Sequence, residues 1–201
     1  MRVMKSYCLT IGFLILFISK GCNIGVEKSE YPGVIRVNLQ ADPTDTSITI
    51  LDKTYIPDTS SVMKVKVFEA KAYIDSCYTI LLPTLDAFID EGKSYNILEK
   101  DEGKYKKYKI YESYAPPGIY NRLQFGIVVK ELEIGGYKIP IEVPEGESLI
   151  YNFDIEFAVY EYDTTEINIQ IKPFKSLYRY RDSYMFNGNL EITSINVYRQ
   201  K

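Results

Sequence analysis

The feature that most restricts the fold of this chain is a long stretch, Leu149 to Phe174, in which apolar and polar residues alternate. Its first half has a large apolar residue at every second position: Leu149, Tyr151, Phe153, Ile155, Phe157 and Val159. Its second half continues the pattern with Ile167, Ile169 and Ile171. A period of two indicates β-strands that bury one face. Because the polar segment 161–165 separates the halves, we expect the two strands to form an antiparallel hairpin.

A single hairpin with one apolar face is only marginally stable in water, so a second sheet must cover that face. The 201 residues favour one domain, and a domain near this size buries roughly 70% of its unfolded surface. The 19 tyrosines, with Ile and Val at alternating positions, suit strands. We therefore expect an all-β fold, a single Greek-key β-sandwich of the Ig or transthyretin-like type with about nine strands. Residues 84–91 fit either a short helix or a loop.

Three local signals predict details of the sheets. In the strand Val62–Ile74 the apolar phase changes at Phe68, as a β-bulge would require, and the terminal strand Leu190–Tyr198 shows a similar slip. The strand Cys77–Leu82 follows a tight turn, and Gly135-Gly136 predicts another hairpin. The Lys- and Tyr-rich segment 104–112 is expected to be an exposed edge strand whose lysines discourage pairing with other chains. A basic and aromatic contact surface is the alternative interpretation of that segment.

The first 21 residues have the layout of a secretory signal peptide, with Arg2 and Lys5 before an apolar run from Tyr7 to Ile18. That run is shorter than the ~20 residues that a membrane-spanning helix needs. It ends in Ser-Lys-Gly-Cys, which resembles the lipobox of bacterial lipoproteins and implies that Cys22 carries acyl chains. Several acyl chains give durable anchoring, because each buried CH₂ contributes about 0.8 kcal/mol. The alternatives are an uncleaved leader that anchors the chain, or cleavage elsewhere by a general signal peptidase.

These segments predict a domain organisation of a signal peptide (1–21), the lipidated Cys22 with its tether (22–32) and one sandwich domain (33–201). The net charge is −3, and the leader contains three basic residues and no acidic one, so the remainder carries −6. A mildly acidic surface lacks the basic patch that nucleic-acid binding requires. Of the three cysteines, Cys8 lies in the leader and Cys22 is the expected lipid site, so Cys77 is expected to be a lone small core residue.

The sequence argues against enzymatic chemistry. Histidine is absent, which removes the commonest general base and the commonest metal ligand. No catalytic sequence motif occurs, and the acidic residues are not concentrated as the carboxylate pair of a glycosidase. Asp42 and Asp45 are weak candidates for a Ca²⁺ site, with the capping of turns as the alternative interpretation. We expect no cofactor.

The best candidate for ligand binding is the polar and aromatic segment 175–189. Its tyrosines supply rigid contact area and its arginines supply planar forks of hydrogen-bond donors. The candidate residues are Tyr178, Arg179, Tyr180, Arg181 and Tyr184. We expect them to contact a glycan or a protein at one end of the sandwich. In the alternative interpretation, alternate tyrosines are buried and the arginines are solvated.

The order of several short motifs resembles a family of prokaryotic envelope lipoproteins that share a domain of unknown function. The motifs are QADPTD at 40–45, SITIL at 47–51, the P-x-G-x-Y entry of Pro116, Gly118 and Tyr120, GGYKIPIEVP at 135–144 and the Lys175-Ser176 pair. Together they span residues 33–197. The P-x-G-x-Y entry is also similar to transthyretin-like and carboxypeptidase-regulatory-like sandwiches, some of which bind carbohydrate or stack as surface modules. The resemblance implies no catalytic residue.

From these features we expect a lipoprotein of the cell envelope, held by its lipid anchor at the outer membrane or cell surface of a diderm cell. Its expected role is a non-catalytic binding module for a carbohydrate or protein ligand. The alternative is a structural subunit of a fimbrial or matrix assembly, joined through edge strands. The oligomeric state separates the two roles, because a module stays monomeric and a subunit assembles.

Overall fold

The computed structural model describes residues 31–83, 94–144 and 149–199. The signal peptide, Cys22, the tether as far as residue 30 and the candidate helix at 84–91 lie outside the described residues. In the described part of the chain every regular element is a β-strand, which confirms the all-β prediction. The sixteen strands exceed the nine expected, because segments interpreted as loops contain short two-stranded ladders.

One sheet has four strands in the order β16–β13–β1–β9. Their bounds are Gly33–Ala41 for β1, Tyr108–Ala115 for β9, Thr164–Ile171 for β13 and Leu190–Tyr198 for β16. β1 runs antiparallel to β9 and parallel to β13, which in turn runs antiparallel to β16. The first described strand therefore lies in the interior of this sheet, between strands that come much later in the chain.

The second sheet is built on β10, a 17-residue strand from Gly118 to Ile134. On one side β10 pairs with β4, and on the other it pairs with β12 and then β11. The bounds are Val62–Ile74 for β4, Cys77–Leu81 for β5, Ser94–Asn96 for β6, Tyr137–Glu142 for β11, Ile150–Val159 for β12, Leu177–Tyr180 for β14 and Ser183–Phe186 for β15.

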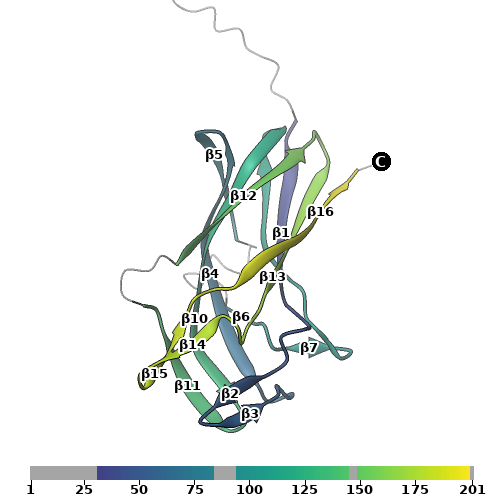
Figure 1. Ribbon diagram of the computed structural model, residues 1–201. Coiled ribbons are helices and arrows are strands. Elements are labelled where there is room, and N and C mark those ends of the chain that lie inside the picture. The colour runs from purple at the N-terminus through teal and green to yellow at the C-terminus, as the bar shows by residue number, and fades with distance from the viewer. Residues whose placement is uncertain (1–30, 84–93, 145–148, 200–201) are drawn as a thin grey trace, which may run out of the picture. The chain divides into compact units, whose positions relative to one another are not determined.

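Two small ladders complete the described strands: β2 (Ile48–Ile50) with β3 (Lys53–Tyr55), and β7 (Lys100–Asp101) with β8 (Lys104–Tyr105). Figure 1 shows the long strands of the two sheets as two layers, with β2, β3, β14 and β15 gathered near the same end as β11.

The predicted hairpin over Leu149–Phe174 is wrong. Both halves are strands with the expected buried faces, but β12 pairs with β10 in the larger sheet and β13 pairs with β1 and β16 in the smaller one. Within residues 149–199, all of them described, β12 and β13 share no ladder. The short segment 160–163 crosses between the layers, with Tyr162 at a φ of 63°. The apolar faces of β12 and β13 thus meet across the core and not side by side.

The core lies between the two sheets. The inward residues of β1 and β13 are fully or almost fully buried, as are those of β4 and β10: Ile35, Val37, Leu39, Ile167, Ile169, Ile171, Met63, Val65, Val67, Leu123, Phe125, Ile127 and Val129. Aromatic rings extend it, with Tyr120 stacked on Phe157 and Phe125 stacked on Phe153. Burying each aliphatic side chain contributes roughly 1.5–3 kcal/mol, so this layer is the main source of stability.

The predicted phase changes and tight turns are confirmed. The phase change in β4 is a bulge at Glu69, whose φ is 42°, and that in β16 is a register shift between Ile192 and Ser194. The pairs Ile74–Cys77 and Ile134–Tyr137 confirm the two tight hairpins. The prediction that Cys77 is buried is wrong, because the residue lies exposed at the tip of the β4–β5 hairpin.

The segment 104–112 is only partly the exposed edge that was predicted. β9 is the end strand of the four-stranded sheet, and Lys107 and Lys109 are exposed, but Tyr105 and Tyr111 are buried. A register shift opposite Val37 and Asn38 places both Ile110 and Tyr111 towards the core. Among the described residues no helix is long and apolar enough to cross a membrane.

Candidate functional site

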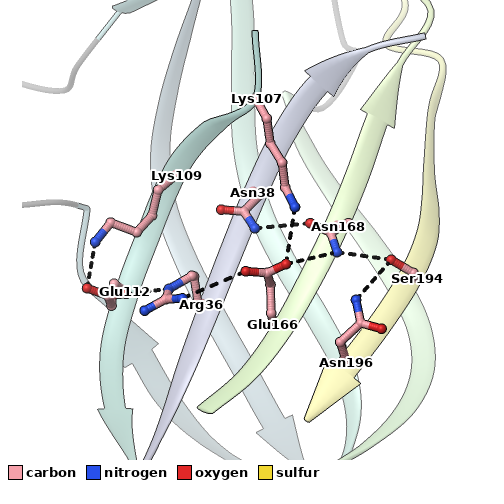
Figure 2. Close-up of polar contacts among 9 residues, drawn as sticks. All are labelled: Arg36, Asn38, Lys107, Lys109, Glu112, Glu166, Asn168, Ser194 and Asn196. Carbon is pink, nitrogen blue, oxygen red and sulfur yellow. Dashed lines mark hydrogen bonds and ion pairs between the residues drawn. The ribbon is translucent and has the colours of Figure 1, made fainter. Parts of the chain in front are cut away.

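The outer face of the four-stranded sheet is strongly polar, and we call it the polar face. It follows from the same alternation that builds the core, since the apolar residues of β1 and β13 point inward and their neighbours point outward. Its members are Arg36, Asn38, Gln40, Lys107, Lys109, Glu112, Glu166, Asn168, Gln170, Ser194 and Asn196. Figure 2 shows most of these side chains in contact across neighbouring strands.

An amide ladder forms the middle of the polar face. The parallel register of β1 and β13 pairs Asn38 with Asn168 and Gln40 with Gln170. Asn38 Nδ2 donates to Asn168 Oδ1 at 3.0 Å, and Asn168 Nδ2 donates to Ser194 Oγ at 2.9 Å. Asn38, Asn168 and Ser194 sit on extended backbone and are hydrogen-bonded to one another, so their donors and acceptors are fixed before any ligand arrives. Gln40 is held separately, because its side-chain amide donates to the backbone carbonyl of Tyr105.

A charged row borders the amide ladder. Arg36 Nε lies 2.5 Å from Glu112 Oε2, and Arg36 Nη1 lies 3.8 Å from Glu166 Oε2. Lys109 and Lys107 pair with the same two carboxylates at 2.7 and 3.1 Å. Burial alone would raise the pKa of both glutamates, but hydrogen bonds outweigh it and hold each pKa below its usual value. Glu112 accepts these bonds from Lys109 and Arg36. Glu166 accepts them from Lys107, Asn168 and Asn38. The carboxylates are therefore ionised at neutral pH and compensated within the face.

The polar face is hollowed where the amide ladder meets β16. A depression of about 220 Å³ is lined by Asn38, Gln40, Lys107, Asn168, Gln170 and Ser194, among others. A second hollow of about 360 Å³ adjoins it, sharing Gln40 and Gln170 and adding the apolar surfaces of Pro43, Ile56, Pro57 and Tyr105. Polar groups thus lead directly into an apolar hollow, an arrangement suited to a ligand with both kinds of surface.

Two exposed tyrosines stand at the other end of the polar face. Tyr114 and Tyr198 belong to the same cross-strand row as Val34 and Thr164, so they point to the outer side. They are 75% and 51% exposed. Strand spacing separates their Cα atoms by about 14 Å across the sheet. Exposed rings of this kind offer flat apolar surfaces beside the polar groups.

The structure does not bring the five predicted ligand-binding residues onto one surface. They lie on the β14–β15 hairpin, whose turn includes Arg181 at a φ of 54°. Arg179 pairs with Tyr184, whereas Tyr178 pairs with Met185 and Tyr180 with Ser183 on the opposite face. All except the half-buried Tyr184 are exposed. Arg179 and Tyr184 alone share a cleft, with residues 44–49.

Asp42 and Asp45 act as turn caps. Asp42 Oδ1 accepts hydrogen bonds of 2.8 Å from both the amide and the hydroxyl of Thr44. Asp45 Oδ2 accepts bonds from the amides of Phe174 and Lys175 at 2.7 and 3.0 Å. For Asp42, burial raises the pKa but the Thr44 bonds outweigh it, so the net pKa is lowered. In the described ranges no cluster of three or more Cys, Asp or Glu side chains is placed to hold a metal ion.

The polar face was not predicted from the sequence. From the sequence, the outward residues of each strand were interpreted only as the solvent-exposed half of an alternating pattern. A signal did exist, because β1 and β13 both carry Asn and then a Gln two positions later, at 38 and 40 and at 168 and 170. Recognising it required knowing that these two distant strands are neighbours in register.

The geometry suits reversible binding of a hydroxyl-rich ligand. Amides and hydroxyls each donate and accept hydrogen bonds, and the charged groups beside them are already compensated. Comparisons with protein-family models, with curated proteins and with solved structures found no match to this chain.

Proposed function

We propose that this protein is a non-catalytic binding module that takes a carbohydrate on its polar face. The observation that carries the proposal is the amide ladder of Asn38, Asn168, Gln40 and Gln170 on adjacent strands. Sugar hydroxyls need partners that both donate and accept, and each amide offers both. The strand scaffold repeats these groups every ~4.8 Å across the sheet and ~6.8 Å along it.

The surroundings of the amide ladder support the same ligand class. Tyr114 and Tyr198 can stack on the apolar faces of sugar rings, as tryptophans do in chains that contain them. The hollow beside Gln40 and Gln170 can accommodate the apolar edge of a sugar ring. A shallow site with a few net hydrogen bonds of about 1 kcal/mol each gives affinities of roughly millimolar strength. Weak single contacts of this kind suit a module that binds a polymer at many positions.

We test the ligand with a panel of neutral oligosaccharides, titrated into the full-length protein and followed by NMR shifts. The key variant is Asn168→Ala, which removes the amide that contacts both Asn38 and Ser194. We expect binding to weaken about tenfold, as the loss of a few hydrogen-bond partners implies.

A matched control is Asn152→Ala on β12. Asn152 also accepts an amide hydrogen bond, from Gln124 at 2.7 Å, but it belongs to the other sheet. Asn152→Ala should bind like the parent protein. Equal affinity in parent and Asn168→Ala, or no binding of any neutral saccharide, would contradict the proposal.

The second part of the proposal is the location. We infer that residues 1–21 are removed and that acyl chains on Cys22 hold the module at the cell envelope, at the outer membrane or cell surface of a diderm cell. The apolar run before Gly21-Cys22 and the lack of any acidic residue in the leader support this inference. The intact mass of protein extracted from membranes should equal residues 22–201 plus the acyl groups. An unmodified Cys22 would exclude the anchor.

A structural subunit remains the second candidate, favoured by one observation. β16 ends the four-stranded sheet, and in the described part of the chain it pairs only with β13. It contains one charged residue, Glu191, and no proline, so little protects its outer edge from pairing with another chain. Sedimentation of the purified protein decides between the roles: a monomer at all concentrations supports the module, and concentration-dependent polymers support the subunit.

A further inference from the structure

A separate cleft of about 380 Å³ lies between the β14–β15 hairpin and the segment 44–49. Its polar lining includes the cations Lys175 and Arg179, the carboxylate of Asp45 and the hydroxyl groups of Thr46, Ser47 and Tyr184. Ile48, Phe174 and Leu177 add apolar surface. The volume falls within the range of small-molecule sites, about 300–1,000 Å³.

The charge in this cleft is unbalanced towards the positive. Asp45 is its one acidic lining residue in the described chain, and that side chain is 3% exposed and occupied by two backbone amides. Arg179 Nε donates to the backbone carbonyl of Arg181 at 3.0 Å, and Nη2 lies 3.9 Å from the fully exposed Asp182, so the Nη groups remain available to a ligand. The neighbouring Asp42 is paired with Thr44 and with Lys172. No described carboxylate lies within ion-pair distance of Lys175, although the charge of Lys175 helps to lower the pKa of Asp42.

The walls of the cleft are fixed to one another. Asp45 Oδ2 ties the 44–49 segment to the amides of Phe174 and Lys175. Ser176 Oγ donates to the carbonyl of Lys172 at 2.7 Å and accepts from the amide of Asn189 at 2.8 Å. Lys175 therefore projects from a segment that is anchored on both sides, and Arg179 projects from the adjoining strand β14, where it pairs with Tyr184 of β15. A preformed site of this kind loses little conformational entropy when a ligand binds.

We propose that this cleft binds a carboxylated sugar unit, with Arg179 and Lys175 on the carboxylate. The guanidinium of Arg179 matches the two oxygens of a carboxylate, and Lys175 supplies a second charge. The hydroxyls of Thr46, Ser47 and Tyr184 face the ring hydroxyls, and the apolar lining meets the C–H edge. The site is distinct from the polar face and is argued from charge, so it does not depend on binding there.

The test uses glucuronate as the probe and methyl glucoside as its neutral counterpart, titrated into the full-length protein by calorimetry or NMR. We expect glucuronate to bind at least tenfold more tightly than methyl glucoside. Arg179→Gln and Lys175→Gln should each weaken glucuronate binding by about tenfold. The matched control is Arg181→Gln, because Arg181 lies on the same hairpin at the turn and does not line the cleft.

Three results would overturn the proposal. These are equal binding of glucuronate and methyl glucoside, an equal loss on Arg181→Gln, and binding of inorganic phosphate without binding of glucuronate. The Asn168→Ala variant separates this inference from the proposed function, since it should leave glucuronate binding unchanged. Neutral saccharides that bind while glucuronate does not would leave the proposed function intact and exclude this site.

Discussion

Glu166 is the residue on which the electrostatics of the polar face converge. Its carboxylate contacts Arg36, Lys107 and Asn168, and its side chain is 12% exposed. Glu112 has a similar position beside Arg36 and Lys109. Both have a lowered pKa in the folded protein, so the ionised form of each carboxylate is more stable in the folded state than in the unfolded state.

We predict that these two carboxylates make the protein sensitive to acid. A lowered folded pKa gives stability that is complete above the unfolded pKa of about 4.3 and is lost as the pH falls through the folded value. Glu166→Gln should therefore flatten the fall in unfolding free energy between about pH 5 and pH 3, measured by urea denaturation. Identical acid slopes for parent and variant would contradict the assignment.

At the scale of elements, the crossing from β12 to β13 depends on a close approach by the first described strand. A Cβ atom added at Gly33 would lie 2.3 Å from the carbonyl oxygen of Tyr160 and 2.6 Å from a methyl group of Val159. Val34 also donates its amide to the carbonyl of Asp163 at 2.9 Å. The start of β1 therefore lies directly against the segment by which the chain changes sheets.

We predict that Gly33→Ala destabilises the fold by roughly 1–3 kcal/mol, the usual cost of forcing an extra carbon into a filled space. The backbone carbonyl of Tyr160 cannot rotate away as a side chain would. Chemical denaturation measures the effect, with Thr59→Ala on an exposed loop as the control. A change of unfolding free energy below about 0.5 kcal/mol, the ordinary range for surface substitutions, would show that the crossing relaxes freely.

The same crossing shows how far the sequence predicts these elements. Alternation over Leu149–Phe174 predicted two strands and the correct buried faces, because burial is set by the local period of two. It did not predict which strands they pair with, since the same alternation is compatible with a hairpin within one sheet and with a crossing between two sheets. The candidate site depends on which strands are neighbours. Asn38 and Asn168 lie side by side only because β1 pairs with β13 in register.

The sequence also does not predict which side chains of a hairpin share a face unless the strands and their register are known. The segment 175–189 holds the five predicted binding residues, yet Tyr178 and Arg179 face opposite sides of the hairpin. Consecutive residues of a strand must do so, and only a loop would let them converge. Arg179 and Tyr184 were predicted and do lie together, because they are cross-strand partners.

At the scale of the whole molecule, stability depends on one layer of side chains shared by both sheets. Phe125 is its centre: it is fully buried, stacks on Phe153 at 5.6 Å and approaches Tyr111 of the opposite sheet at 6.3 Å between ring centroids. We predict that Phe125→Ala lowers the unfolding free energy by about 3–5 kcal/mol. Calorimetric melting measures the loss, with Tyr114→Ala on the outer surface as the control. A loss of less than about 1 kcal/mol would mean that the sheets do not share this core.

The interior position of β1 has a consequence for how the chain acquires its structure. Its neighbours β9 and β13 begin at residues 108 and 164, so β1 cannot gain its two partners until segments far along the chain are available. Contacts so distant in sequence close slowly, because loop entropy is lost before any pairing is gained. A chain delivered amino end first, by a ribosome or through a translocation channel, would leave β1 without β9 until residue 115 had emerged and without β13 until residue 171 had emerged. Holdase chaperones that bind extended apolar segments should therefore act on nascent lengths that stop short of residue 171.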